Sequence, residues 1–376
     1  MNQGTKLLHA RMDRLATLAR KLLPTMFDAS SGLFAHKAVC VADGRRALGA
    51  NALYSAMSAI GIHNDDAGST VPVGLDVTAN TLAGSCRGMS SSTGLVAATT
   101  WALAVAEDNR TRPALGALER GFNPIRSSSM DLGLVLSGLA AVIDAFPGLR
   151  AQAARVAALA TQELVQRFSD VAQLFRGSSW ALRPRRLLQW NLTSFASQVY
   201  PIHGLAQYAR ASARPPPQQI QRAAERLIAT QGQLGQWWWI YSMRTGAVLE
   251  GYPVYSVHQD AMAFMALASL ENLGLGSYRD ELVRGLSWIF GKNELRTPLV
   301  DFDRGFISRC IQRRGADADG ILGMSGEQWK RVVRSSWGLQ HPVATTHEPD
   351  ELEILEETRP YHLGWLLYAR SLIRDW

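Results

Sequence analysis

The sequence predicts an all-α protein, an (α/α)6 toroid in which six helical hairpins form a double-walled helical barrel within a single domain, residues 1–376. Three observations support this. Apolar residues recur at three- and four-residue spacing along most of the chain. Helices almost without charge on one side alternate with more highly charged helices, as inner and outer walls require. A short motif of proline beside an aromatic residue also precedes three of the charge-poor helices.

The helical spacing is clear at the N-terminus, where Leu8, Met12 and Leu15 begin an apolar face over residues 5–23. Turn residues, mainly glycine, proline and short polar side chains, separate the later helical segments. The remaining predicted helices span residues 51–62, 75–87, 92–106, 113–121, 130–146, 149–168, 194–210, 217–231, 255–273, 278–290 and 361–375. Pairing each outer helix with an inner helix gives six hairpins.

The repeated motif occurs at Tyr200-Pro201, Tyr252-Pro253 and Pro360-Tyr361. Proline is tolerated in a first helical turn because the amide that it lacks would be unpaired there. The helices that follow the motif are predicted to form the inner wall, and the charged helices before them the outer wall. Periodicity is weakest at about 294–360, where a long irregular insertion or lid is expected.

Composition limits the class of protein. Hydrophobic residues make up 47% and charged residues 19%, which is typical of a soluble protein with a large interior. No run of eighteen uncharged apolar residues is present, so we expect no transmembrane segment, although peripheral membrane contact stays open. The N-terminus lacks the apolar core of a signal peptide, which favours a cytoplasmic protein.

The net charge of +7 would attract an anionic small molecule, an acidic glycan or nucleic acid, or it reflects solvated loops rich in arginine. Basic clusters lie at residues 183–186 and at Arg313-Arg314, but no nucleic-acid motif accompanies them, so we expect a small-molecule substrate and no nucleic acid. The three cysteines are far apart and show no metal-ligand spacing. We therefore expect neither a disulfide nor a metal site.

The candidate site lies where the inner helices begin, because their N-termini and the loops leading into them meet at one mouth of such a barrel. Asn51 and Tyr54 come from the first hairpin. The candidate substrate-binding residues are Trp237, Trp238, Trp239, Tyr241, Glu250, Tyr252, Arg359, Tyr361 and His362. Three consecutive tryptophans cannot all face one core, so we expect at least one ring on a cavity wall or surface, where it would stabilise a cation or stack on a sugar. Alternatively, all three pack between helices.

The candidate catalytic residues form two groups. Tyr255, His258 and Asp260 are the densest polar group on an otherwise apolar helix, and the first two share a face because they are three residues apart. Asp301 and Asp303 lie in the predicted insertion. Paired carboxylates can raise one another's pKa, which suits a general acid. The alternatives are a histidine satisfied within the core and carboxylates that bind a divalent ion or cap a turn.

The stretch from Ala223 to Trp237 is an amphipathic helix ending in Gln231, followed by a glycine turn and a tryptophan. It resembles the QW repeat of the terpenoid cyclase and protein prenyltransferase superfamily, in which glutamine and tryptophan staple a helix end to the next turn. The resemblance covers mainly residues 190–376. It implies an α/α toroid enzyme that starts carbocation chemistry on an isoprenoid by protonation, in an aromatic-lined cavity.

On this resemblance Asp260 or Asp303 would be the acid, and no cofactor is expected unless a diphosphate-bearing substrate brings Mg²⁺. The chain would be a divergent member of the superfamily. The superfamily's Asp-x-Asp-Asp motif is missing, because Arg304 follows Asp303, and its zinc ligands are missing too.

Two alternatives remain open. The first is a carbohydrate-active (α/α)6 enzyme, a hydrolase, lyase or epimerase acting on an acidic glycan, for which Tyr255, His258, Asp260, Glu250 and Arg359 supply suitable groups. The second is a non-catalytic toroid that binds a lipid or a partner. An apolar aromatic cavity would favour the cyclase, a polar groove the glycan enzyme, and a filled barrel the binding protein.

Overall fold

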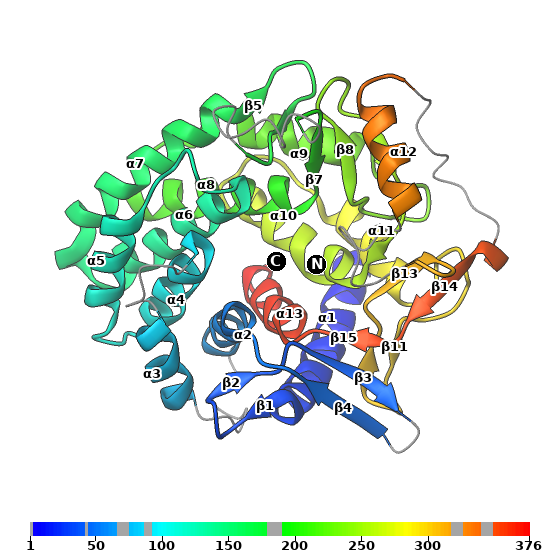
Figure 1. Ribbon diagram of the computed structural model, residues 1–376, viewed down its shortest axis with the longest axis horizontal. Coiled ribbons are helices and arrows are strands. Elements are labelled where there is room, and N and C mark those ends of the chain that lie inside the picture. The colour runs from blue at the N-terminus through cyan, green and yellow to red at the C-terminus, as the bar shows by residue number, and fades with distance from the viewer. Residues whose placement is uncertain are drawn as a thin grey trace.

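Two concentric rings of helices make up most of the protein (Figure 1). The computed structural model describes residues 3–41, 44–65, 75–85, 92–178, 190–316, 326–339 and 349–376. The inner ring consists of α2 (Ala52–Asn64), α4 (Thr93–Val105), α6 (Ser129–Ala145), α8 (Ala196–Ser212), the π-helical turn η5 (His258–Met262) continuing into α10 (Ala263–Glu271), and α13 (Pro360–Leu372). Each inner helix packs against the next, and α13 closes the ring on α2.

The outer ring covers the inner one. It consists of α1 (Gln3–Leu22), α3 (Leu75–Ser85), α5 (Thr111–Gly121), α7 (Arg150–Arg167), α9 (Gln219–Ala229) and α11 (Arg279–Ile289). α1 packs on α13, α5 on α4, α7 on α6, α9 on α8, and α11 on η5. These pairings confirm the predicted (α/α)6 toroid.

Glycines allow the inner helices to approach closely. A Cβ atom added to Gly61 of α2 would lie 1.9 Å from the carbonyl oxygen of Gly364 of α13. A Cβ atom on Gly204 of α8 would similarly lie 2.3 Å from the carbonyl oxygen of Gly133 of α6. Only a residue without a side chain fits at such contacts, so these glycines set the spacing of neighbouring inner helices.

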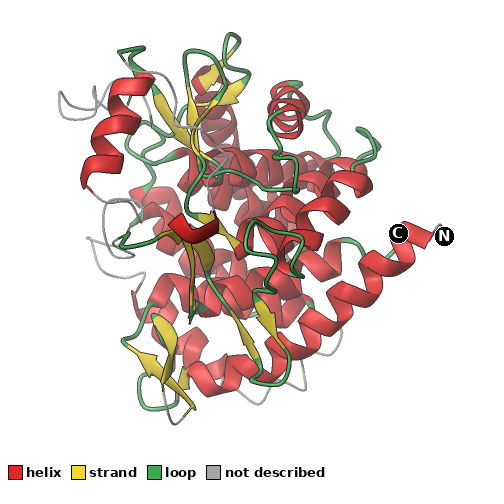
Figure 2. Ribbon diagram, turned by 90° about the vertical axis from the view of Figure 1, so that its right-hand side faces the viewer, coloured by secondary structure: helices red, strands yellow, loops and turns green. Residues whose placement is uncertain are grey.

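Short strands follow the outer helices and lead into the inner ones. They are β1 (Phe27–Asp28), β2 (Leu33–Phe34), β3 (Lys37–Val41), β4 (Gly44–Leu48), β5 (Phe168–Ser169), β6 (Leu174–Phe175), β7 (Leu192–Ser194), β8 (Ile240–Ser242), β9 (Val248–Glu250), β10 (Val254–Tyr255), β11 (Val300–Asp301), β12 (Phe306–Ile307), β13 (Cys310–Arg313), β14 (Leu352–Leu355) and β15 (Glu357–Thr358). All the pairings between them are antiparallel, in orders that include β7-β8-β9, β10-β13-β14 and β15-β3-β4. In Figure 2 most strands lie toward the left, and the two termini lie together at the right, so the strands and the termini are at opposite ends of the barrel.

The region predicted as an irregular insertion contains regular structure in its described part. It holds the last five strands, the amphipathic helix α12 (Gly326–Ser336) and the 3-10 turn η7 (Pro349–Glu351). Two more 3-10 turns lie elsewhere, η1 (Leu23–Met26) and η3 (Pro147–Leu149). β13 pairs with β10 and β15 pairs with β3, so the region is tied to both halves of the chain. That it acts as a lid stays a prediction.

The basic cluster at 183–186 lies outside the described residues. Within the described ranges, none of the helices combines the length and hydropathy needed to cross a membrane.

Candidate functional site

The barrel has a cavity at each end. The larger one, about 780 Å³, lies at the C-terminal ends of the inner helices, and two of its carboxylates are already paired with arginine, Asp144 with Arg210 and Asp65 with Arg20. The smaller one, about 370 Å³, lies at the N-terminal ends, where the strands lead in. We assign the candidate site to the smaller cavity because buried hydrogen-bond donors in its wall lack partners, as described below.

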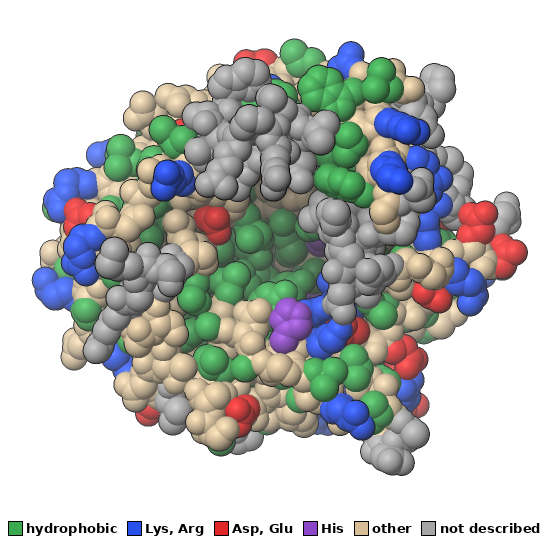
Figure 3. All heavy atoms as spheres, in the orientation of Figure 1, with side chains coloured by type: hydrophobic (Ala, Val, Ile, Leu, Met, Phe, Trp, Pro, Cys, Tyr) green, Lys and Arg blue, Asp and Glu red, His purple; other side chains and the backbone are tan. Residues whose placement is uncertain are grey.

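The smaller cavity is mostly aromatic and apolar. Its described lining consists of Leu53, Tyr54, Met57, Met130, Ala196, Tyr200, Trp239, Tyr255, Val257, His258, Met262, Arg309 and Tyr361. Figure 3 looks onto this end of the barrel and shows a hollow with a hydrophobic floor, with a histidine and basic side chains at its edge. The mouth predicted from the sequence is therefore a real depression.

One wall of the cavity carries its polar groups. We call Trp239, Tyr255, His258 and Arg309 the donor wall. The Trp239 ring stacks on His258 at 5.2 Å between centroids and meets Tyr255 edge-on at 5.4 Å. The guanidinium carbon of Arg309 lies 5.3 Å from the centre of the Tyr255 ring. The π-helical turn η5, a feature frequent at functional sites, carries His258 into this cluster.

His258 is a neutral hydrogen-bonding group. Burial lowers the pKa of His258 to about 3, so the ring is uncharged near neutral pH. Its Nδ1 lies 3.3 Å from the carbonyl oxygen of Trp237. Because a carbonyl only accepts, Nδ1 carries the proton and Nε2 is the accepting nitrogen.

Two N–H groups of the donor wall are unsatisfied. The indole N–H of Trp239 and the Nε–H of Arg309 are buried and have no hydrogen-bond partner among the described residues. Leaving such a donor unpaired costs about 1–3 kcal/mol, and more when the group is charged. A ligand that supplied acceptor oxygens here would recover that cost.

Positive charge surrounds the same wall. The Glu357 carboxylate accepts from Lys37 at 3.0 Å, Arg309 at 2.9 Å and Arg359 at 2.6 Å. Burial alone would raise the pKa of Glu357, but Arg309 and Arg359 outweigh it and hold that pKa below its ordinary value. Three cations thus share one carboxylate, which leaves an excess of positive charge beside the cavity.

Aromatic rings continue the wall from this cluster toward α2. Arg359 contacts the His36 ring, which stacks on Tyr54 at 5.3 Å, and Tyr54 in turn meets Tyr361 at 4.5 Å. Burial raises the pKa of Tyr361 to about 12, so its hydroxyl keeps its proton and can donate. Pairing of β15 with β3 brings these residues together from the two ends of the chain.

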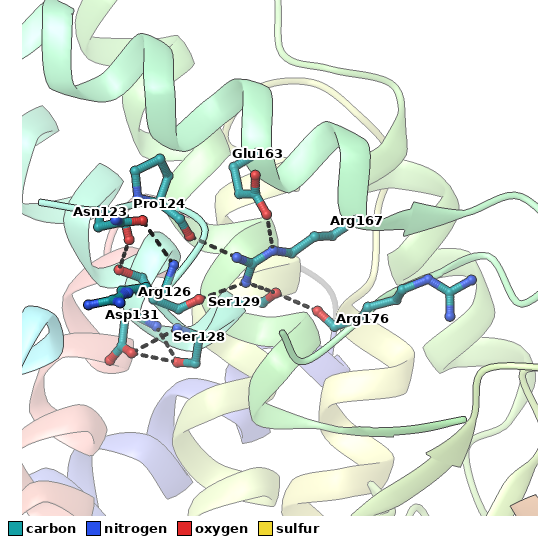
Figure 4. A network of polar contacts seen from close by, with 10 residues as sticks. Asn123, Pro124, Arg126, Ser128, Ser129, Asp131, Glu163, Arg167 and Arg176 are labelled. Atoms are coloured by element: carbon teal, nitrogen blue, oxygen red, sulfur yellow. Dashed lines mark hydrogen bonds and ion pairs between the residues drawn. The ribbon is translucent and has the colours of Figure 1, made fainter. Parts of the chain in front are cut away.

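The opposite wall is apolar. The buried Arg167 contacts the loop that leads into this wall (Figure 4). Arg167 of α7 donates to Glu163 at 2.8 Å and to the carbonyl oxygens of Ser127 and Pro124 at 2.9 and 2.8 Å. These contacts hold the loop that leads into α6, and Met130 in the first turn of α6 lines the cavity.

Of the residues predicted from the sequence, five line the cavity, namely Tyr54, Trp239, Tyr255, His258 and Tyr361. Arg359 lies behind them, where it donates to Glu357. The others are held in the surrounding packing. Trp237 stacks near Phe195, Trp238 donates to the Thr230 carbonyl oxygen, Tyr241 is buried, Tyr252 donates to Glu294, and Glu250 pairs with Arg313.

None of the predicted carboxylates lines the cavity. Asp260 is fully buried and lies 2.8 and 2.9 Å from Nε2 of His362, and burial raises the pKa of Asp260. Asp301 accepts from the backbone N–H groups of Asp303 and Arg304 at 3.0 and 2.8 Å. Asp301 therefore caps the turn between β11 and β12, which was the alternative to a catalytic role for Asp301 and Asp303.

Arg309 and Tyr200 line the cavity but were not predicted as site residues, and neither was His36, which contacts Arg359 and stacks on Tyr54. Arg309 sits between two short strands with no local signal, and it reaches the cavity only because β13 pairs with β10. Tyr200 belongs to the repeated Tyr-Pro motif, which could have marked it.

Solved structures with a similar (α/α)6 toroid fold include several glycosidases. A glycosidase in complex with glucose is similar with a TM-score of 0.59 and 14% identity, over 100% of this chain and 99% of that one. A glycosyl hydrolase family 88 protein from Bacteroides vulgatus gives 0.56 and 10%, over 98% and 99%. The unsaturated glucuronyl hydrolase of Bacillus sp. GL1, responsible for the degradation of glycosaminoglycan, gives 0.54 and 13%, over 96% and 94%. No protein-family model and no curated protein matches the sequence.

The predicted terpenoid cyclase-like function is wrong, and with it the predicted isoprenoid substrate. The structures named above, which share this toroid along nearly the whole chain, are glycosidases. The stretch that resembled a QW repeat also makes different contacts. The Gln231 amide donates to the backbone carbonyls of Gly235 and Glu281, at 3.1 and 3.0 Å, and so ties the end of α9 to α11.

Proposed function

We propose that the protein is a glycoside hydrolase that binds an acidic sugar in the smaller cavity. The observation that carries this proposal is Arg309, a largely buried guanidinium that lines the cavity with its Nε–H unpaired. The similar fold of an unsaturated glucuronyl hydrolase supports the same substrate class.

The donor wall suits a uronate. A guanidinium binds a carboxylate through charge-assisted hydrogen bonds, and the three cations around Glu357 favour an incoming anion. The unpaired indole N–H of Trp239 would donate to a ring or hydroxyl oxygen, and His258 Nε2 would accept from a sugar hydroxyl. The rings of Trp239 and Tyr255 supply the flat faces on which sugars stack.

Hydrolysis also requires a proton donor, for which Asp131 is our candidate. It follows Met130 in the first turn of α6 and is half-buried; Met130 lines the described cavity, and Asp131 itself is not among the described lining residues. Ser128 fixes its carboxylate, donating from its backbone N–H at 3.0 Å and from its hydroxyl at 2.7 Å. An asparagine at this position keeps an acceptor for Ser128, so Asp131→Asn should abolish turnover while leaving the thermal melt nearly unchanged.

Substrate charge provides the main test. Aryl β-glucuronide and the matching aryl β-glucoside are compared as substrates for the wild type and for Arg309→Gln. Hydrogen bonds to charged groups contribute about 1.5–3 kcal/mol. We therefore expect kcat/KM for the glucuronide to fall about ten- to a hundredfold, with a much smaller change for the glucoside.

The matched control is Arg314→Gln, because Arg314 is an exposed arginine that donates to the Asp350 carbonyl oxygen and does not line the cavity. Equal losses in Arg309→Gln and Arg314→Gln, or binding of neither sugar by the wild type, would contradict the proposal. A thermal melt of each variant separates loss of binding from loss of fold.

A further inference from the structure

The cavity has two chemically different walls. Opposite the donor wall lie Leu53 and Met57 of α2 and Met130 of α6, which we call the methionine wall. In the order of the inner ring α2 and α6 flank α4, which is diametrically opposite η5, so the two walls face each other across the barrel.

The three side chains of the methionine wall cannot donate a hydrogen bond to a sugar hydroxyl, and thioether sulfur is only a weak acceptor. Hydroxyls pressed against it would lose their hydrogen bonds to water without replacement. Methionine is instead adaptable and polarisable, and suits apolar groups of varied shape.

The volume of the cavity also indicates a small ligand. The cavity measures about 370 Å³, near the lower end of the roughly 300–1,000 Å³ that ligand sites occupy. A sugar held by Arg309 and Trp239 would leave the methionine wall to be covered by whatever is attached to that sugar.

We infer that the site takes an amphipathic glycoside, an acidic sugar joined to an apolar alkyl or aryl group, with the sugar on the donor wall and the apolar group on the methionine wall. This inference rests on the proposed function and specifies its substrate class. A glycan extended by further sugars would place hydroxyls against the side chains of Met57 and Met130, which carry no hydrogen-bond donor.

The test is a series of alkyl β-D-glucuronides (methyl, propyl and hexyl), titrated into the protein by calorimetry. Each buried methylene should tighten binding about three- to fourfold, until the wall is covered. Affinities that stay the same from methyl to hexyl would overturn the inference.

Variants of Met130 locate the effect. Met130→Gln keeps the length of the side chain but adds an amide, so the gain from methyl to hexyl should shrink by about tenfold or more. Met130→Leu keeps an apolar surface and should retain the gain. An equal gain in all three proteins would show that the alkyl group binds elsewhere, which would also overturn the inference.

Failure of the proposed function looks different. If no glucuronide of any chain length binds, or if Arg309→Gln binds methyl glucuronide as well as the wild type, the acidic-sugar site itself is wrong. If methyl glucuronide binds through Arg309 but hexyl glucuronide binds no better, only the assignment of the methionine wall is wrong.

Discussion

Arg167→Met is the change whose cost can best be worked out from the structure. The Arg167 side chain is only 2% exposed, and its guanidinium donates to Glu163, to two backbone carbonyls and to Ser129. Methionine retains much of the aliphatic length but none of the donors. Glu163 would then be left as a buried carboxylate without its cation, and the carbonyls of Ser127 and Pro124 would lose a donor.

Removing one partner of a buried ion pair typically costs about 3–5 kcal/mol. Because whole domains are stable by only about 5–15 kcal/mol, Arg167→Met should lower the urea midpoint substantially. The double variant Arg167→Met with Glu163→Gln should recover part of that loss, since no lone buried charge remains.

The assay is urea denaturation followed by both circular dichroism and tryptophan fluorescence, whose coincidence checks for a single transition. The control is Arg155→Met. Arg155 lies on α7, like Arg167, but its ion pair with Glu119 of α5 is solvent-exposed, so its loss should leave the midpoint unchanged. If Arg167→Met cost no more than Arg155→Met, the account of how the loop before α6 is held would be refuted.

Two further predictions concern the barrel itself. Gly61→Ala would place a methyl group against the Gly364 backbone and should lower the free energy of unfolding by about 1–3 kcal/mol or more. The control is Gly84→Ala, in open space on α3, which should raise the free energy of unfolding by about 0.5–1 kcal/mol in the same urea melts. An unchanged stability of Gly61→Ala would show that α2 and α13 can separate freely. Burial lowers the pKa of His203 to about 3 in the folded protein, whereas a histidine in the unfolded chain has a pKa of about 6.5. Between these two pH values the unfolded chain binds a proton at His203 and the folded chain does not. Stability should therefore fall as the pH drops from about 6.5 to about 3, by up to about 1.4 kcal/mol per pH unit, and His203→Gln should flatten that slope; equal slopes would contradict the assignment.

The helices were predictable because their signals are local. The predicted helix at 278–290 corresponds to α11, Arg279–Ile289, and the charge contrast between predicted helices separated the outer wall from the inner wall. The strands were not predictable, because they are two to five residues long and pair across the chain, as β3 does with β15. A period of two residues cannot be read from so short a segment.

The site residues likewise divide into those that local sequence predicted and those that only the tertiary structure revealed. Tyr255 and His258 could be placed at the mouth because they lie at the start of one inner helix, and Trp239 because it lies in the segment that leads into that helix. The role of Arg309 could not, because strand pairing brings it to the wall and Glu357 and Lys37 join it from opposite ends of the sequence.

The sequence by itself determined a ring of helical hairpins with an aromatic mouth, because periodicity, charge and turn residues act between neighbours in the chain. The tertiary structure decided that none of the predicted carboxylates lines the cavity, that Asp260 pairs with His362, and that Trp239 and Arg309, which line the cavity, each carry a buried N–H without a partner among the described residues. Whether a polar group is satisfied depends on all the residues around it in space, and most of those are distant in sequence.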